Sequence, residues 1–350
     1  MIDQRHTARA TAMQSTARSR VRLPRLDRER ALLFGESYGL VALLALVVLF
    51  FAIWGKTAAV FPTSANFNNI VGNQSVLAIT ALAAIIPLVA GQFDLSVGAI
   101  VGLSSVVSAK LMASTGLPLG VCGLVAVATG TSVGIANGIV VARLGINSLI
   151  STLGVATVLG GIAVSVAGNE PIVQGISGSL VRFGTGTFLG LPNTLFVLVV
   201  AALLVLYLLE HTPYGRHLHA IGSNREAARL VGVGVDRLVF RSFVLSGAIC
   251  GAAGFLQLAR SGSGDPQIGV NFTLPALAAA FLGATAIRPG RFNVGGTLVA
   301  IFFLAASVSG LTLAGAEAYV QDLFNGSALI AGVAVSTLIA RQRLRGRKAA

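Results

Sequence analysis

Charged residues are scarce in this chain of 350 residues. Asp, Glu, Lys and Arg make up 11% of it, whereas soluble globular chains carry about 25%. Long stretches carry no charge, and each approaches or exceeds the roughly 20 apolar residues that cross a bilayer. They include residues 37–55, 144–169, 183–209, 242–259, 266–287, 292–316 and 323–340. So many uncharged stretches exclude a soluble fold.

Cysteine and histidine are also rare, which excludes a disulfide scaffold and argues against a metal site. Cys122 and Cys250 lie in apolar stretches and are expected to pack as small hydrophobic side chains. The four histidines lie in the N-terminal tail or in one polar segment, so the G-x-S-x-G pattern at 130–134 has no histidine base at membrane depth. We therefore predict no metal, no cofactor and no catalytic residue.

A phosphate-binding loop is missing as well. Gly55-Lys56-Thr57 resembles the end of one, but that motif needs a glycine five residues before the first, where this chain has Phe50. No other segment offers such a loop. The chain is therefore not expected to be an enzyme that hydrolyses ATP.

Basic residues outnumber acidic ones by 25 to 12 and gather at the two ends of the chain. They are Arg5, Arg9, Arg18, Arg20, Arg22, Arg25, Arg28 and Arg30 before the first uncharged stretch, and Arg341, Arg343, Arg345, Arg347 and Lys348 after the last. Lys and Arg concentrate on the cytoplasmic side of membrane proteins. The pattern therefore predicts a cell-membrane protein with both termini cytoplasmic and an even number of spans, and not a nucleic-acid-binding protein.

The first 36 residues do not resemble a secretory signal. The apolar stretch that follows, 37–54, is longer than the core of such a signal and has no A-x-A-like cleavage site after it. A solvated basic tail is the first interpretation. An organelle transit peptide is the alternative, because the tail is rich in Arg, Ala and Thr and poor in acidic residues.

The hydropathy pattern predicts an all-α polytopic membrane protein of about ten transmembrane helices. The expected spans are 37–54, 71–90, 97–113, 118–142, 147–167, 194–209, 239–259, 273–287, 293–313 and 320–340. The predicted organisation is a basic cytoplasmic tail at 1–36, a transmembrane domain at 37–340 and a second basic tail at 341–350. Alternate counting places the long loop 168–193 outside and the polar segment 211–241 inside. Only Lys56, Lys110, Arg182 and Arg260 then fall outside, which supports the parity of the count.

Small residues at four-residue spacing mark helix faces that can approach closely in lipid. Gly130, Gly134 and Gly138 make the clearest such face, and Gly98 with Gly102 and Gly247 with Gly251 repeat it. We expect these faces to pack helices together.

Asp94 is the one acidic residue in the charge-poor stretch between Lys56 and Lys110. It lies in the hairpin 91–96 between the second and third spans. One interpretation is the N-cap of the third span, where its carboxylate would accept an unpaired backbone N–H. The other is a gate or coupling residue, because ionisable groups near membrane depth are commonly functional. The two are compatible.

The segment 222–234 predicts a short helix, Asn224–Val231, on the cytoplasmic side. Ser223 and Glu226 fit a capping box with serine at the N-cap and glutamate at N3, and Gly232 or Gly234 can end the helix. Two turns of helix are not stable alone. The helix must therefore pack on its own bundle or on a partner.

These segments resemble the permease subunit of ABC importers for ribose, xylose, arabinose and galactose. The matching residues run from about Phe61 to Ile339 and include 91–98 (G-Q-F-D-L-S-V-G), Asn137-Gly138, 151–154 (S-T-L-G), 212–216 (T-P-Y-G-R), 220–229 (A-I-G-S-N-R-E-A-A-R), 232–233 and 235–237. Gln92 stands where the family usually has glycine.

The resemblance implies a transmembrane permease subunit that conducts a monosaccharide. Its implied partners are two ABC ATPase subunits below, an extracytoplasmic solute-binding protein above, and a second permease copy or homologue in the membrane. It makes 211–241 a coupling loop whose short helix enters a groove on the ATPase. The expected ATPase-coupling residues are Ser223, Asn224, Arg225, Glu226, Ala227, Ala228 and Arg229. The expected pathway or gate residues are Gln74, Phe93, Asp94, Ser96, Asn137, Ser151 and Thr152.

Two other functions remain open. A branched-chain amino acid ABC permease is a related group, although the D-L-S-V-G hairpin favours sugars. A self-sufficient secondary transporter would usually carry several ionisable residues inside its spans, and this chain offers little beyond Asp94.

Overall fold

The structure is a computed structural model that describes the backbone of residues 25–348 and the side chains of residues 37–335. The chain divides into two units between residues 35 and 36, and apart from the first residues of α2 all that follows concerns the second unit. The basic side chains of both tails, and with them the transit-peptide alternative, lie outside the described residues.

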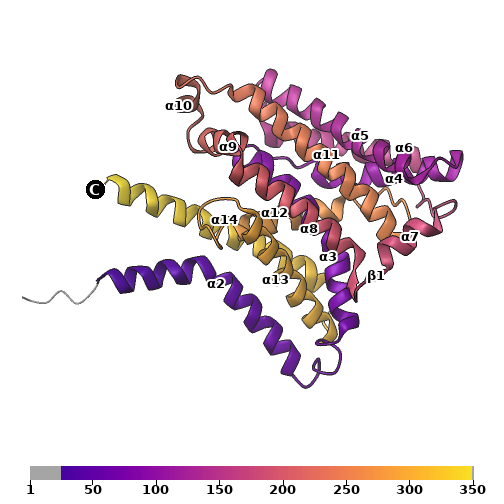
Figure 1. Cartoon of the computed structure of the whole chain (residues 1–350), viewed down its shortest axis with the longest axis horizontal. Coiled ribbons are helices and arrows are strands. Elements are labelled where there is room, and N and C mark those ends of the chain that lie inside the picture. The colour runs from indigo at the N-terminus through magenta and orange to yellow at the C-terminus, as the bar shows by residue number, and fades with distance from the viewer. Residues whose placement is uncertain (1–24, 349–350) are drawn as a thin grey trace, which may run out of the picture. The chain divides into compact units, whose positions relative to one another are not determined.

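The described chain is almost entirely helical (Figure 1). Its longer helices are α2 (Arg25–Ile53), α3 (Ser64–Val89), α4 (Val97–Thr115), α5 (Leu119–Gly138), α6 (Ser148–Ala167), α8 (Asn193–Leu206), α11 (Val235–Ser261), α12 (Val270–Gly283), α13 (Val294–Leu313) and α14 (Tyr319–Lys348). The shorter helices are α7 (Gly178–Thr185), α9 (Pro213–Ser223) and α10 (Arg225–Leu230), and π-helical turns η1 (Ile139–Arg143) and η2 (Tyr207–His211) extend α5 and α8.

Seven of the helices are long and apolar enough to cross a membrane, counted over the described residues. They are α3, α4, α5 with η1, α6, α8 with η2, α11 and α13, while α12 and the described part of α2 from Ser37 are shorter apolar helices. A helix occupies each of the ten expected ranges, but several boundaries differ from the prediction.

The largest boundary differences have local causes. Helix α3 begins at Ser64, seven residues early, because the Thr63 hydroxyl caps it by accepting the Asn66 N–H at 3.3 Å. Helix α12 ends at Gly283 and not at Ile287. Ile287 adopts a left-handed conformation with φ of 58°, and Pro289 lacks the N–H that a continuing helix needs.

The loop expected at 168–193 contains regular structure. Helix α7 occupies part of it, and a small hairpin follows in which β1 (Thr187–Phe188) pairs antiparallel with β2 (Leu191–Pro192). Gly190 lies in the tight turn between them with φ of 79°, a conformation that glycine adopts without strain.

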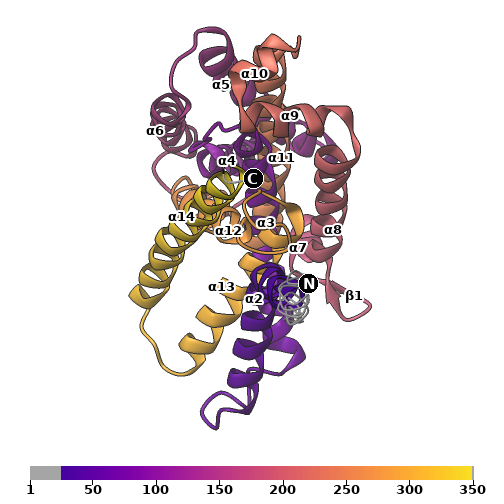
Figure 2. The same ribbon diagram turned by 90° about the vertical axis from the view of Figure 1, so that its left-hand side faces the viewer.

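Helices α3 and α11 form the centre of the bundle. Helix α3 is buried along almost all of its length from Val71 to Val89 and packs against α8, α11, α12 and α13. Helix α11 packs on α3, α4 and α5. Figure 2 shows both in the middle of the view, between α6 on one side and α8 on the other.

The predicted glycine faces are confirmed as helix contacts. A side chain at Gly130 would meet the backbone of Gly247 and Gly251 on α11, and one at Gly134 would meet the Phe243 carbonyl. The faces of α5 and α11 therefore interlock backbone to backbone. Gly98 and Gly102 of α4 both face the backbone at Gly269, with the closer approach at Gly98. Cys122 and Cys250 are buried free thiols, as predicted.

Six of the connections between helices lie at two ends of the bundle, four at one and two at the other (Figure 1). One, here named the α10 end, contains residues 90–96, 143–147, 211–234 and 284–293. Its segments touch one another: Gly222 packs on the Val89 backbone, and Arg288 pairs with Glu210 at 2.9 Å. The other, the α7 end, contains residues 168–193 and 261–269, joined by the bridge between Ile172 and Gly264.

Candidate functional site

Hydroxyl groups from α6 accept hydrogen bonds from the extended backbone of the hairpin 91–96, which connects α3 and α4. Gly91 turns the chain out of α3 with φ of 74°. The Phe93 N–H then donates to the Ser148 hydroxyl at 3.1 Å, and the Leu95 N–H donates to the Thr152 hydroxyl at 2.9 Å. Ser148 and Thr152 are four residues apart and so lie on one face of α6. The two hydroxyl groups thus accept hydrogen bonds from backbone N–H groups that have no helical partner in this extended segment.

Asp94 organises the next step of the hairpin. Its Oδ1 accepts the Ser96 N–H at 3.0 Å and the Ser96 hydroxyl at 2.6 Å, and the Asn137 amide of α5 donates to the Ser96 hydroxyl at 2.8 Å. All three side chains are buried. Ser96, and not Asp94, occupies the N-cap position of α4, so the predicted cap position is wrong, but the Asp94 carboxylate does accept a backbone N–H just before the helix, from Ser96.

Several polar atoms around this network have no partner among the described residues. They include Asp94 Oδ2, Asn137 Oδ1 and the Ser246 hydroxyl of α11. Unpaired polar atoms in a buried site are costly. Their concentration between α4, α5 and α11 marks a site whose polarity is not needed for packing alone.

Aromatic rings continue the hairpin toward α13. Phe93 stacks on Phe281 at 6.0 Å between ring centroids, and Phe281 contacts Phe292 edge to face at 5.3 Å. Next to Phe292, the Asn293 side chain caps α13 by accepting the Gly296 N–H at 2.7 Å. Phe93-Asp94 and Phe292-Asn293 therefore lie at the same end of the bundle.

Helix α10 is present, but the predicted capping box is wrong. Helix α9 starts at Pro213 and runs through Ser223, so Ser223 is already helical and cannot be an N-cap. Asn224 takes that place in an extended conformation and accepts the Ala227 N–H at 3.0 Å. Gly232, with φ of 82°, follows the end of the helix as expected. The segment 211–241 is therefore mostly helical and continues into α11 from Val235.

The charged residues of α10 are engaged within the chain. Arg225 and Arg229 donate to the same Asp236 oxygen at 3.0 and 2.9 Å, and Arg229 lies 3.6 Å from Glu226. Ala228 is buried against the bundle. Two apolar side chains are also strongly exposed here: Leu230 is 89% exposed, and Val231, just after the helix, is 78% exposed.

A cavity of about 670 Å³ lies between α10 and the hairpin, and Phe93 is the predicted pathway residue that lines it. Arg225 and Arg229 line it together with Gln92 and Phe93 of the hairpin and Ser148 of α6. The short helix and the Asp94 hairpin therefore share one site at the α10 end.

Two predicted pathway residues lie elsewhere. Gln74 lines a different cavity toward the α7 end, and Ser151 donates to the Ser148 carbonyl at 3.2 Å and lines an apolar groove. The prediction missed Ser148 itself. Its spacing of four from Thr152, directly after the capping residue Asn147, is the signal that could have found it.

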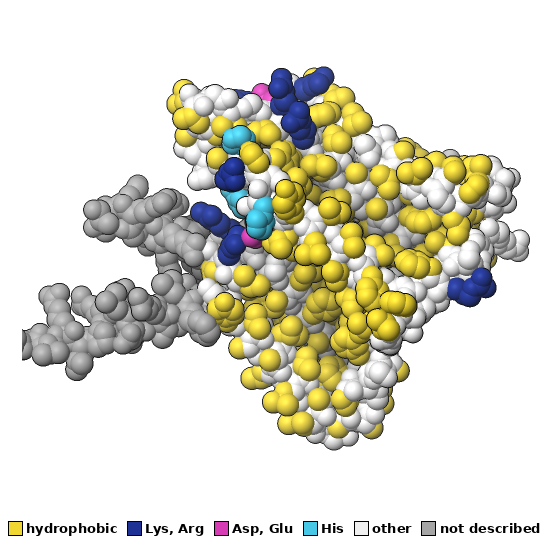
Figure 3. All heavy atoms as spheres, in the orientation of Figure 1, with side chains coloured by type: hydrophobic (Ala, Val, Ile, Leu, Met, Phe, Trp, Pro, Cys, Tyr) yellow, Lys and Arg dark blue, Asp and Glu magenta, His cyan; other side chains and the backbone are white. Residues whose placement is uncertain are grey.

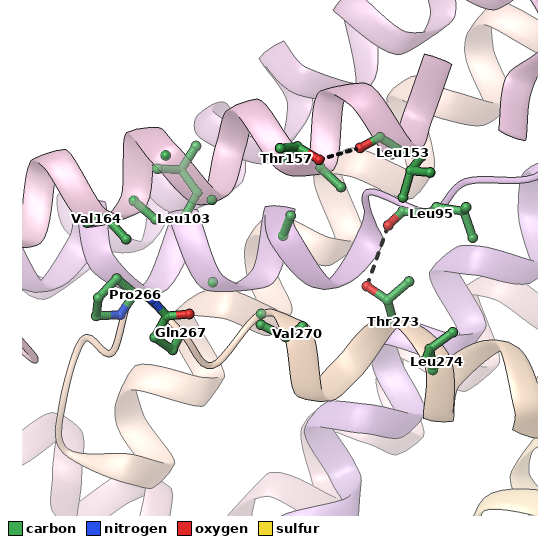
Figure 4. A pocket seen from close by; sticks show the side chains of 17 residues that line it. Leu95, Leu103, Leu153, Thr157, Val164, Pro266, Gln267, Val270, Thr273 and Leu274 are labelled. Carbon is green, nitrogen blue, oxygen red and sulfur yellow. Dashed lines mark hydrogen bonds between the residues drawn. The ribbon is translucent and has the colours of Figure 1, made fainter. Parts of the chain in front are cut away.

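A second large cavity, of about 610 Å³, lies between α4, α6 and the start of α12 (Figure 4). Its walls are mostly aliphatic, with Leu103, Val164 and Leu274 among them. The Thr273 hydroxyl faces the Leu95 carbonyl at 3.5 Å, so this cavity borders the back of the hairpin.

Most of the basic and histidine side chains on the visible face lie at the α10 end. Figure 3 shows them there, with one further basic group at the opposite end, while hydrophobic side chains cover most of the remaining visible face. An apolar surface of this extent suits a lipid environment. The helices and their surface define a multi-pass membrane protein.

Comparison with known proteins identifies its family. The family model described as "Branched-chain amino acid transport system / permease component" matches residues 66–333, so the chain belongs to this family. No solved structure matches it significantly.

Curated relatives carry sugar permease names. The chain is 31% identical to the ribose import permease protein of Escherichia coli over 57% of this chain and 63% of that protein. It is 29% identical to the D-allose transport system permease protein of Escherichia coli over 88% of this chain and 94% of that protein. It is 32% identical to the L-arabinose transport system permease protein of the same organism over 56% and 60%. The matches to the ribose and arabinose proteins span less than two thirds of their length.

Proposed function

We propose that this chain is the transmembrane permease subunit of an ABC importer and conducts a monosaccharide across the cell membrane. The support is its family, together with relatives named for ribose, arabinose and allose transport. In this proposal ATP is hydrolysed by separate ATPase subunits, since the sequence offers no phosphate-binding loop of its own.

The observation that carries the coupling part of the proposal is the cavity shared by α10 and the Asp94 hairpin. Leu230 and Val231 present an exposed apolar tip that suits a groove on an ATPase. A movement of α10 driven by the ATPase would be transmitted to the hairpin, because Arg225 of α10 and Phe93 of the hairpin line the same cavity. Asp94, Ser96, Asn137 and Thr152 then form a gate that holds the helix ends together in the resting state.

The proposed topology has ten spans, with the α10 end and both termini cytoplasmic. The sorting of connections into two ends fits alternate crossing, and the basic residues of the loops favour the α10 end as the inner one. The proposed assembly contains a second permease copy or homologue, two ATPase subunits at the α10 end and a solute-binding protein at the α7 end.

The test is uptake by cells that lack the chain and regain it from a plasmid. Radiolabelled D-ribose, L-arabinose, D-allose and L-leucine are supplied in turn, with the ATPase intact or inactivated. Uptake of one sugar that needs both the chain and an active ATPase supports the proposal. Uptake of leucine and of no sugar would instead support the amino acid transport in the family's description.

A further inference from the structure

Amide side chains from three helices converge on a small cavity of about 180 Å³ in the α7 half of the bundle. Gln74 comes from α3, Asn271 from the first turn of α12, and Gln321 and Asn325 from the first turns of α14. Gln321 and Asn325 are four residues apart and so share one face of α14. Convergence from three helices far apart in sequence distinguishes this group from polar residues scattered along a surface.

These four amides make no side-chain hydrogen bond within the described part of the chain. Asn73, beside them, differs because its oxygen accepts the Arg260 Nε–H at 2.9 Å and its amide donates to Asn69 at 2.8 Å. Each free amide offers two donors and one acceptor oxygen. The cavity therefore offers hydrogen-bond donors and acceptors that are not already bound to other described side chains.

The rest of the cavity wall is apolar, and no charged residue lines it. Phe272 is buried, and Pro275, Leu304 and Val308 complete the wall. A charged solute would lose part of its hydration against these apolar side chains without gaining a counter-charge, which is unfavourable. Hydroxyl groups suit the site because each can donate to an amide oxygen and accept from an amide N–H.

We infer that this cavity binds one neutral, hydroxyl-rich solute molecule, a single sugar ring, on its way through the permease. The inference rests on the proposed function and adds a substrate site to it. The cavity volume of about 180 Å³ agrees with this solute. A cavity of about 150 Å³ holds one benzene ring, so this slightly larger cavity suits a single sugar ring better than an oligosaccharide. The site also gives Gln74 a role distinct from the hairpin, as a contact for the solute near the α7 end.

The experiment replaces amides by apolar side chains of similar size. The variants are Gln74→Met, Asn325→Leu and Gln321→Met, the last at an exposed position where misfolding is not expected. Gln257→Met is the matched control, because Gln257 is a half-buried glutamine on α11 outside the cavity. Uptake of radiolabelled D-ribose, L-arabinose and D-allose is measured at equal membrane levels of the chain.

We expect each cavity variant to lower the uptake of the transported sugar by about fivefold, as the loss of one or two hydrogen bonds predicts, and the control to match wild type. Wild-type uptake by all three cavity variants would overturn the site while leaving the proposed function intact. ATPase-independent sugar uptake that still falls in the variants would overturn the proposed function and leave the site. Transport of leucine and of no sugar would overturn both.

Discussion

The Asp94 carboxylate and the Ser96 side chain form the smallest unit on which the hairpin depends. One oxygen of Asp94 accepts both the backbone N–H and the hydroxyl of Ser96, and Asn137 donates to the same hydroxyl. An asparagine at position 94 keeps an acceptor oxygen in place. An alanine there leaves two buried donors unpaired, at about 1–3 kcal/mol for each group.

We therefore expect Asp94→Asn to preserve the folded chain and Asp94→Ala to lower its thermal unfolding midpoint clearly. Both variants are measured in the same detergent or nanodisc. Equal midpoints for Asp94→Ala and wild type would show that the network does not hold the hairpin. A midpoint of Asp94→Asn as low as that of Asp94→Ala would show that the negative charge, and not the acceptor geometry, matters.

At the scale of helices, α5 and α11 make one of the close backbone contacts in the described part of the bundle. A methyl group at Gly134 would meet the Phe243 carbonyl and lie 3.0 Å from the Val244 Cα. Gly134→Ala is therefore expected to destabilise the chain by about 1–3 kcal/mol, as overpacking generally does. Gly120, on the same helix, has nothing within 4 Å, so Gly120→Ala should be neutral or slightly stabilising. Thermal unfolding of both variants tests this, and equal effects would contradict it.

Helix α10 carries the proposed coupling function. Glu226 is the most exposed of its charged side chains, at 78%, and lies beside the apolar tip at Leu230. We expect Glu226→Leu to disturb docking on the ATPase, so that more ATP is hydrolysed per sugar transported while the chain stays folded. Glu226→Gln keeps a polar surface and should remain close to wild type. Normal coupling in Glu226→Leu, or a photo-crosslinker at Leu230 that never captures the ATPase, would contradict the role of α10.

The sequence predicts helices better than it predicts their ends. Long apolar stretches and glycine spacing determine where helices form and which faces meet, and these depend on local composition. The N-cap of α10 was predicted wrongly because serine and asparagine are both favourable N-cap residues. Only the extent of the preceding helix α9, which includes Ser223, decides in favour of Asn224. Ser148 was missed because its partner is the Phe93 backbone, 55 residues away, and the spacing of four from Thr152 is the only local sign of that contact.

At the scale of the whole molecule, the two ends of the bundle should face opposite compartments. Cys122 and Cys250 are buried, so thiol reagents should give little background. The test uses two variants, Arg225→Cys and Gly178→Cys. A membrane-impermeant thiol reagent applied to intact cells should label the new cysteine of Gly178→Cys and not that of Arg225→Cys. Labelling of both from outside, or of Arg225 alone, would contradict the proposed orientation.

The central claim is that a sugar passes through this chain at the expense of ATP hydrolysed by another subunit. The most direct measurement is sugar uptake by proteoliposomes that contain the purified permease with its ATPase and solute-binding protein. We predict uptake that requires ATP on the α10 side, stops with a non-hydrolysable analogue and continues when ionophores collapse all ion gradients. Uptake that proceeds without ATP and stops with the ionophores would contradict the claim and identify a secondary transporter.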